Sequence, residues 1–331
     1  MLSRCAFCLC LLAGLLWTQD QPPLTTFRTE SDLVVLNVSV FDKDGNIVKG
    51  LPKTAFTVQE NGEPQEIKVF RQEDVPISLG LVIDDSASMK EKRDRVNSAA
   101  LAMVRASNPQ DEVFVLNFNE DAQLAQDFTS DVKRLENSLR ISRPSGQTAM
   151  RDALVVGLDH LRAHAKNDKK ALLVVTDGED NISIESQARL VEAAQRLDVI
   201  IYAIGLLGAE QPASARRARE SLEELTRATG GRAWFPADVS EVERITPEIA
   251  HEIRNQYIIG YTPTNTAQDG TYRKIQVQVN VPGATVRTRS GYYARGGHPS
   301  GALRYNGVDG THLPGGSSSS GGPVDRLRPG F

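Results

Sequence analysis

Cysteine is nearly absent from this chain of 331 residues: there are only three, and all of them lie within the first ten positions. The remainder therefore has no thiol for a disulfide, for cysteine catalysis or for a zinc–thiolate site. A basic excess is missing too, since 38 lysines and arginines face 42 aspartates and glutamates, a formal net charge of −4. Nucleic-acid binding relies on positive charge that displaces counterions, so it is not expected.

Long hydrophobic runs are also missing, except for one at the amino terminus. Residues 6–17 form an unbroken apolar run that follows Arg4. Its length matches the hydrophobic region of a secretory signal and falls short of the ~20 residues that span a bilayer as a helix. We expect residues 1–20 to be a signal peptide with a poorly marked cleavage site, which leaves retention by an uncleaved N-terminal segment open. The mature protein is expected to be exported, periplasmic or extracellular, without a transmembrane span.

The segment at residues 30–74 is expected to be β-structure. Apolar and polar residues alternate there with a period of two, which is typical of half-buried strands. A turn is expected at Asn61-Gly62, because the Asn-Gly pair is favoured in the two-residue loop of a tight hairpin. This turn is expected to join strands at 56–59 and 67–70.

A matching β segment is expected at residues 255–295, where the period of two returns. The similar alternation suggests that the two flanks pair across the chain into one small β-sandwich, which carries the central region as an insert. Residues 296–331 are rich in glycine and serine, and they are expected to be a disordered tail.

The central region, residues 77–254, alternates short apolar runs with segments of helical spacing. Continuous apolar runs are typical of parallel strands that are buried on both faces. A final helix is expected to begin at Thr246-Pro247 and to end at Arg254, since proline is favoured at the first helical position. This pattern predicts an α/β fold with a doubly wound, mostly parallel sheet. The expected strands lie at residues 79–83, 113–116, 172–175 and 199–204.

Oxygen-bearing side chains gather where the expected strands end. Asp84, Asp85, Ser86 and Ser88 follow the first strand directly, and an Asp177 loop follows the strand at 172–175. A further loop carries Thr148 before a helix. Open α/β sheets bind ligands in the crevice outside the carboxyl ends of their strands. These loops are therefore the candidate site.

Magnesium is the cation that such oxygens suit. Mg²⁺ takes six oxygen ligands, and it commonly keeps several waters beside one or two carboxylates. Hydroxyl ligands fill coordination positions without neutralising charge, so the ion stays able to accept a carboxylate from outside. We expect Mg²⁺ as the cofactor, with Mn²⁺ as a substitute.

The three loops resemble the metal-ion-dependent adhesion site of a von Willebrand factor type A domain. The resemblance covers residues 77–254, and it implies that the metal is held directly or through water. Alanine stands at position 87, where the family usually has glycine between the two serines. The implied ligands are Asp84, Ser86, Ser88, Thr148 and Asp177.

Two further acidic residues, Asp85 and Asp180, are candidates for a supporting role near the metal. The flanks resemble a narrower group, the exported "VWFA-related" proteins that are known chiefly from acidobacteria. That resemblance rests on residues 56–62, on Gln256-Tyr257 and on residues 291–293. It carries no defined biological role with it.

The leading functional hypothesis is a non-enzymatic binding module, in which Mg²⁺ captures an acidic side chain of a partner protein. A metal-dependent phosphoester hydrolase or phosphotransferase is the alternative, with Asp85 as its nucleophile. A structural envelope protein that binds through its β flanks is a third hypothesis. The sequence names neither the partner nor the oligomeric state.

Overall fold

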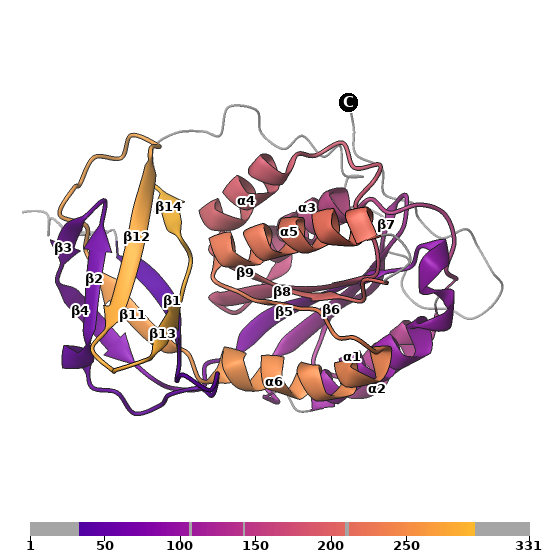
Figure 1. Ribbon diagram of the computed structural model, residues 1–331, viewed down its shortest axis with the longest axis horizontal. Coiled ribbons are helices and arrows are strands. Elements are labelled where there is room, and N and C mark those ends of the chain that lie inside the picture. Colours follow the sequence, from indigo (N-terminus) through magenta and orange to yellow (C-terminus); the bar gives the residue numbers. More distant parts are fainter. Residues whose placement is uncertain (1–32, 106–107, 142, 209–211, 295–331) are drawn as a thin grey trace, which may run out of the picture. The chain divides into compact units, whose positions relative to one another are not determined.

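The computed structural model describes residues 33–105, 108–141, 143–208 and 212–294 (Figure 1). The expected signal peptide and the expected disordered tail lie outside these residues. None of the helices in the described part combines the length and the hydrophobicity that a membrane crossing requires.

A six-stranded sheet forms the centre of the chain, with the strand order β10-β9-β8-β5-β6-β7. Every neighbouring pair is parallel except β6 with β7, which is antiparallel. Nearly all residues of β5, β6, β8 and β9 are buried, which explains their continuous apolar sequence. The strands are β5 (Ile77–Asp84), β6 (Glu112–Phe118), β7 (Ala122–Thr129), β8 (Lys169–Thr176), β9 (Val199–Gly205) and β10 (Ala233–Trp234).

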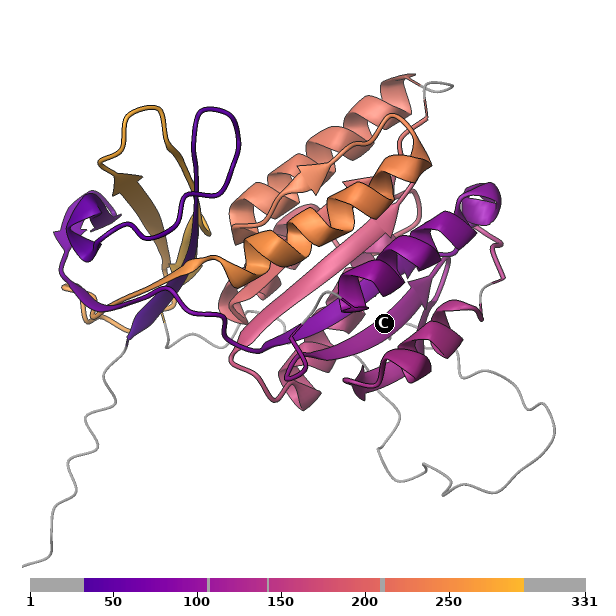
Figure 2. The same ribbon diagram turned by 90° about the horizontal axis from the view of Figure 1, so that it is seen from below.

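Helices cover both faces of this sheet (Figures 1 and 2). Successive residues of a strand point to opposite faces, so Leu81 packs in one core and Val82 in the other. This arrangement confirms the doubly wound α/β fold. One face carries α1 (Arg93–Arg105), α2 (Val132–Leu139) and α6 (Val242–Arg254), and the other carries α3 (Met150–His164), α4 (Gln187–Arg196) and α5 (Pro212–Thr229).

The start of α6 differs from the prediction. The helix begins at Val242 instead of Thr246-Pro247, and Pro247 lies inside it. A short 3-10 turn precedes it, closed by a capping box between Asp238 and Glu241. Proline inside a helix costs about 3 kcal/mol, but the extra turn buries Val242 and Ile245 against the sheet, which offsets that cost.

The two flanks pair with each other, as their alternation suggested. β1 is antiparallel to β11, and β2 is antiparallel to β12, so each of two four-stranded sheets contains strands from both flanks. Buried side chains of both sheets share one core. The strand orders are β13-β1-β11-β4 and β14-β12-β2-β3, with β1 (Val34–Phe41), β2 (Phe56–Glu60), β3 (Glu63–Gln65), β4 (Ile67–Arg71), β11 (Tyr257–Tyr261), β12 (Tyr272–Val279), β13 (Thr285–Arg287) and β14 (Gly291–Tyr293).

The hairpin at Asn61-Gly62 has the expected turn but a different partner strand. Both residues have positive φ, 51° and 90°, which suits a two-residue hairpin loop. The turn joins β2 to β3, whereas β4 pairs with β11 in the other sheet. The predicted pairing of 56–59 with 67–70 was therefore wrong, because the chain changes sheets at Glu66, between β3 and β4.

A buried carboxylate joins the sequence motifs of the two flanks. Glu60 accepts hydrogen bonds from the hydroxyls of Tyr261, at 2.8 Å, and Tyr292, at 2.9 Å. The guanidinium of Arg273 completes the cluster, 3.4 Å from the other carboxylate oxygen. A Cβ on Gly291 would lie 2.4 Å from the Arg273 carbonyl oxygen, so glycine is required there. These motif positions therefore serve the core of the sandwich.

A second buried cluster ties the end of α6 to the sandwich. Glu252 accepts hydrogen bonds from Arg287 of β13, at 3.1 and 3.3 Å, and from the Ser39 hydroxyl of β1, at 3.4 Å. Burial raises the pKa of Glu252, and Arg287 opposes this rise. The ammonium of Lys169 donates to the Ile253 carbonyl, which caps the carboxyl end of the helix.

Candidate metal centre

The first loop of the candidate site is built around Asp84, the last residue of β5. Its side chain is fully buried, and one oxygen accepts a hydrogen bond from the Ser86 amide at 2.8 Å. The other accepts from the Thr176 hydroxyl of β8 at 2.6 Å. β5 and β8 are adjacent parallel strands, so this contact joins their carboxyl ends.

Hydroxyl and carboxylate groups meet between the first loop and the loop after β8. The Ser88 hydroxyl donates to Asp177 Oδ1 at 2.7 Å, and the Ser86 and Ser88 hydroxyl oxygens are 3.2 Å apart. The contact between Ser88 and Asp177 connects residues that are 89 positions apart in sequence.

Thr148 lies on the remaining loop, just before α3. The Thr148 hydroxyl is 4.0 Å from the position that a Cβ would take on Gly178, next to Asp177. The Thr148 amide donates to the Asn181 side chain at 3.2 Å, and the Asn181 amide donates to the Thr148 carbonyl at 3.1 Å. These bonds join the Thr148 loop to the loop after β8. The amide of Ala87 donates to the Gly146 carbonyl and joins the loop after β5 to the Thr148 loop.

The electrostatics of the site are dominated by buried charge. Burial raises the pKa of Asp84, and its hydrogen bonds from Ser86 and Thr176 oppose the rise. Asp177 is held at its second oxygen by the Lys92 ammonium, with 2.6 Å between Nζ and Oδ2. The side chain of Asp177 is only 1% exposed.

The donor set suits Mg²⁺ in kind. The predicted ligands offer carboxylate and hydroxyl oxygens, which this hard cation prefers. In the described part of the chain, no group of three or more His, Cys, Asp or Glu side chains is arranged to hold a metal. A metal at this site would therefore depend on hydroxyls as well as on Asp84 and Asp177. The metal itself stays a prediction.

Part of the central region matches a known family of domains. Residues 79–179 match the family model of the von Willebrand factor type A domain. The chain contains a von Willebrand factor type A domain. The matched segment begins in β5 and ends just past the Asp177 loop, so it includes all three loops of this A domain.

Solved structures with a similar fold are remote in sequence. A von Willebrand factor type A protein from Catenulispora acidiphila is 13% identical, with a TM-score of 0.48 over 78% of this chain and 73% of that chain. The vWF domain of the type V pili tip protein Mfa5 from Porphyromonas gingivalis is 14% identical, with a TM-score of 0.44 over 55% of this chain and 97% of that one. The PilB minor pilin from Streptococcus sanguinis is 13% identical, with a TM-score of 0.44 over 56% of this chain, which spans 62% of the pilin chain. A search of curated protein sequences returned no match.

Asp85 is held by Arg93 of α1 and by the backbone of the loop that leads to Thr148. One carboxylate oxygen is 3.4 Å from Nε of Arg93, and the other accepts the Arg143 amide at 3.1 Å. Arg93 is itself buried, and burial lowers its pKa to about 10, which the neighbouring charges of Asp85 and Asp84 oppose. Asp85 therefore braces the first loop against α1 and the segment that carries Thr148.

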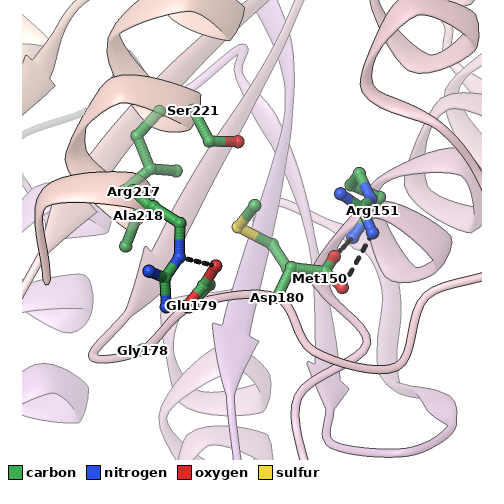
Figure 3. A pocket seen from close by; sticks show the side chains of 9 residues that line it. Met150, Arg151, Gly178, Glu179, Asp180, Arg217, Ala218 and Ser221 are labelled. Atoms are coloured by element: carbon green, nitrogen blue, oxygen red, sulfur yellow. Dashed lines mark hydrogen bonds and ion pairs between the residues drawn. The ribbon is translucent and has the colours of Figure 1, made fainter. Parts of the chain in front are cut away.

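Asp180 lies beside a small pocket next to the Asp177 loop (Figure 3). The pocket has a volume of about 70 Å³, and Met150 lies between its two ion pairs. Asp180 accepts hydrogen bonds from the Arg151 amide, at 2.7 Å, and from its guanidinium, at 3.3 Å. Arg217 binds Glu179 through two nitrogens at 2.6 and 2.8 Å. Both carboxylates of the pocket therefore bind arginine.

Sequence reasoning missed one side chain of the site, Lys92. It lies four positions after Ser88, and the predicted metal ligand Asp177 is 85 positions away. No sequence signal pointed to Lys92, because on a 3-10 turn the residue that returns to the side of Ser88 is Glu91, three positions later.

Proposed function

We propose that the A domain is a Mg²⁺-dependent protein-binding module that captures an acidic side chain of a partner protein. Asp84, Ser86, Ser88, Thr148 and Asp177 would hold the ion, directly or through water. The observation that supports this best is the 2.7 Å contact between Ser88 and Asp177, which unites hard oxygen donors from two loops at one sheet edge.

The binding chemistry follows from the charge of the donors. Asp84 and Asp177 bring two negative charges, and the hydroxyls of Ser86, Ser88 and Thr148 bring none. When bound, Mg²⁺ would therefore stay electrophilic enough to accept a carboxylate from a partner. The hydrogen bonds from Thr176 and from the Ser86 amide fix the orientation of the Asp84 carboxylate before any ligand arrives.

The contacts of Asp85 and of the flank motifs give less support to the two alternative functions, a phosphoester hydrolase and a protein that binds through its β flanks. Asp85, the nucleophile that a phosphoester hydrolase would use, is held by Arg93 and by the Arg143 amide. Glu60 and Tyr257, from the motifs of the flanks, are buried in the sandwich and present no binding surface. We therefore propose a non-enzymatic role in an exported protein, periplasmic or extracellular, with the A domain as the binding part.

Calorimetric titration with MgCl₂ tests the metal. We expect one Mg²⁺ per chain in the wild type. In Asp177→Ala the dissociation constant for Mg²⁺ should be at least about tenfold larger, because a charged ligand is lost. Asp168→Ala is the matched control, since Asp168 is exposed and immediately precedes β8, whereas Asp177 immediately follows that strand. Equal binding in all three proteins, or none in the wild type at millimolar Mg²⁺, would refute the metal site.

The partner chemistry needs a second experiment with a peptide library displayed on phage. Peptides selected in Mg²⁺ and eluted by EDTA should share an aspartate or a glutamate. Replacement of that residue by asparagine or glutamine should abolish capture. Peptides that bind equally well in EDTA would contradict a metal-bridged carboxylate.

A further inference from the structure

Lys92 forms an ion pair with a residue that the proposed function assigns to the metal. The ammonium is 2.6 Å from Asp177 Oδ2, while Ser88 donates to Oδ1. The Asp177 side chain is 1% exposed, whereas the Lys92 side chain is 32% exposed. A buried carboxylate is thus neutralised by a cation that can withdraw into solvent.

The backbone places Lys92 in this position. Its amide donates to the Met89 carbonyl at 2.9 Å, at the end of the 3-10 turn over Ala87–Glu91. Met89 is fully buried in the core and anchors that turn. The Lys92 side chain therefore starts from a fixed point next to the site, and only its flexible stem has to move to release Asp177.

We infer that Lys92 is an internal counter-cation that competes with the divalent metal for Asp177 and thereby sets the metal affinity of the site. This inference rests on the proposed function, because it takes Asp177 as a metal ligand. The competition is an exchange in which the ion approaches Asp177 as the ammonium leaves.

The size of the effect depends on how often Asp177 is free of the ammonium. The observed dissociation constant for Mg²⁺ equals the intrinsic constant divided by the fraction of molecules in which Asp177 is free. If that fraction is about one tenth, removal of the Lys92 charge tightens Mg²⁺ binding by about tenfold. Higher salt reduces this gain, because it screens the partly exposed pair.

The same pair protects the metal-free protein. Removing one partner of a buried ion pair leaves an uncompensated charge, which strongly destabilises the folded state. With Lys92 present, loss of the metal does not leave Asp177 in that condition. The site thus accepts weaker metal binding in exchange for a stable metal-free state.

Calorimetric titration of the full chain with MgCl₂ tests this inference in four proteins. Lys92→Met keeps the length of the side chain and removes its charge, so we expect about tenfold tighter binding. Lys92→Arg restores the charge and should bind as weakly as the wild type. Lys90→Met is the matched control, because Lys90 lies exposed on the same 3-10 turn, and it should not change the affinity.

Thermal unfolding adds a readout that does not depend on a partner. In EDTA, Lys92→Met should unfold at a lower temperature than the wild type, and saturating Mg²⁺ should close this gap. An unchanged unfolding temperature in EDTA would refute the stabilising role of Lys92 in the metal-free protein.

The outcomes separate this inference from the proposed function. Equal Mg²⁺ affinity in the wild type and Lys92→Met overturns the role of Lys92 and leaves the metal site standing. Mg²⁺ binding by Lys92→Met alone supports the competition and overturns a metal-loaded wild type. No binding by either protein overturns the metal site, and the role of Lys92 with it.

Discussion

The buried cluster around Glu60 gives the sharpest test of the sandwich. The side chains of Glu60 and Arg273 are both only 2% exposed. Arg273→Met replaces the guanidinium by an uncharged side chain and so leaves the buried Glu60 carboxylate without its counter-charge. Loss of one partner of a buried pair costs about 3–5 kcal/mol. The hydroxyls of Tyr261 and Tyr292 remain as donors to Glu60, so we expect the lower end, about 3 kcal/mol.

Urea denaturation followed by far-UV circular dichroism measures this loss. With a slope of about 3 kcal/mol per molar urea, the midpoint should fall by about 1 M. The fluorescence of Trp234 follows the A domain, because this residue lies in β10. A shared shift in both signals would mean that the sandwich and the A domain unfold together.

The double variant Glu60→Gln with Arg273→Met shows whether charge is the cause. The glutamine carbonyl still accepts the tyrosine hydrogen bonds, and no carboxylate is left unpaired. We expect it to recover about 1–2 kcal/mol relative to Arg273→Met alone. Additive losses, or an Arg273→Met midpoint equal to that of the wild type, would refute the account of the cluster.

Three further predictions concern pH, packing and the hairpin. The folded state raises the pKa of Glu252, so above pH 4.5 it keeps a proton that the unfolded state has lost. The stability of the wild type relative to Glu252→Gln should therefore fall as the pH rises from about 4.5, by up to about 1.4 kcal/mol per pH unit. Urea midpoints of the two proteins that change in parallel with pH would contradict this. Gly80→Ala would put a Cβ 2.3 Å from Phe114 Cζ, so a loss of about 1–3 kcal/mol is expected in the same assay, and a loss below 0.5 kcal/mol would show that the core yields. Gly62→Ala, at a φ of 90° with open space around it, should cost about 1 kcal/mol through backbone strain alone, and an unchanged midpoint would show that the turn adapts.

The buried strands were predictable because their physics is local. β5, β6, β8 and β9 each contain a continuous apolar run, which a sheet covered on both faces requires. The loops that follow β5 and β8 were predictable for the same reason, since parallel strands end at one edge. The sequence also indicated that the two flanks would pair.

The features that were missed have a weak or misleading local signal, or depend on a partner far along the chain. β7 is an edge strand with a mostly half-buried, polar sequence, so it lacks a clear apolar pattern. β4 pairs with β11, almost 190 positions away, and its own sequence does not distinguish that partner from β2. The first turn of α6 was missed because Pro247 is a stronger local signal than the capping box at Asp238.

The oxygen donors of the candidate site were predictable, but their charge balance was not. Asp85 looked like an additional acidic group beside the metal, yet it binds Arg93 eight positions later. Lys92 was not singled out by any sequence pattern, yet it reaches Asp177 from another loop. Such pairings depend on side-chain directions in space, which a sequence pattern does not contain.

The pairing of β4 with β11 has a mechanical consequence. β4 ends at Arg71 as the chain enters the A domain, and β11 begins at Tyr257 as it returns, with Arg71 opposite Ile258. A force that pulls the A domain away from the sandwich would load this ladder from its open end and break its hydrogen bonds one after another, as a zipper opens. The ion pair between Glu252 and Arg287 lies close to that end, so it resists the tension before the ladder does.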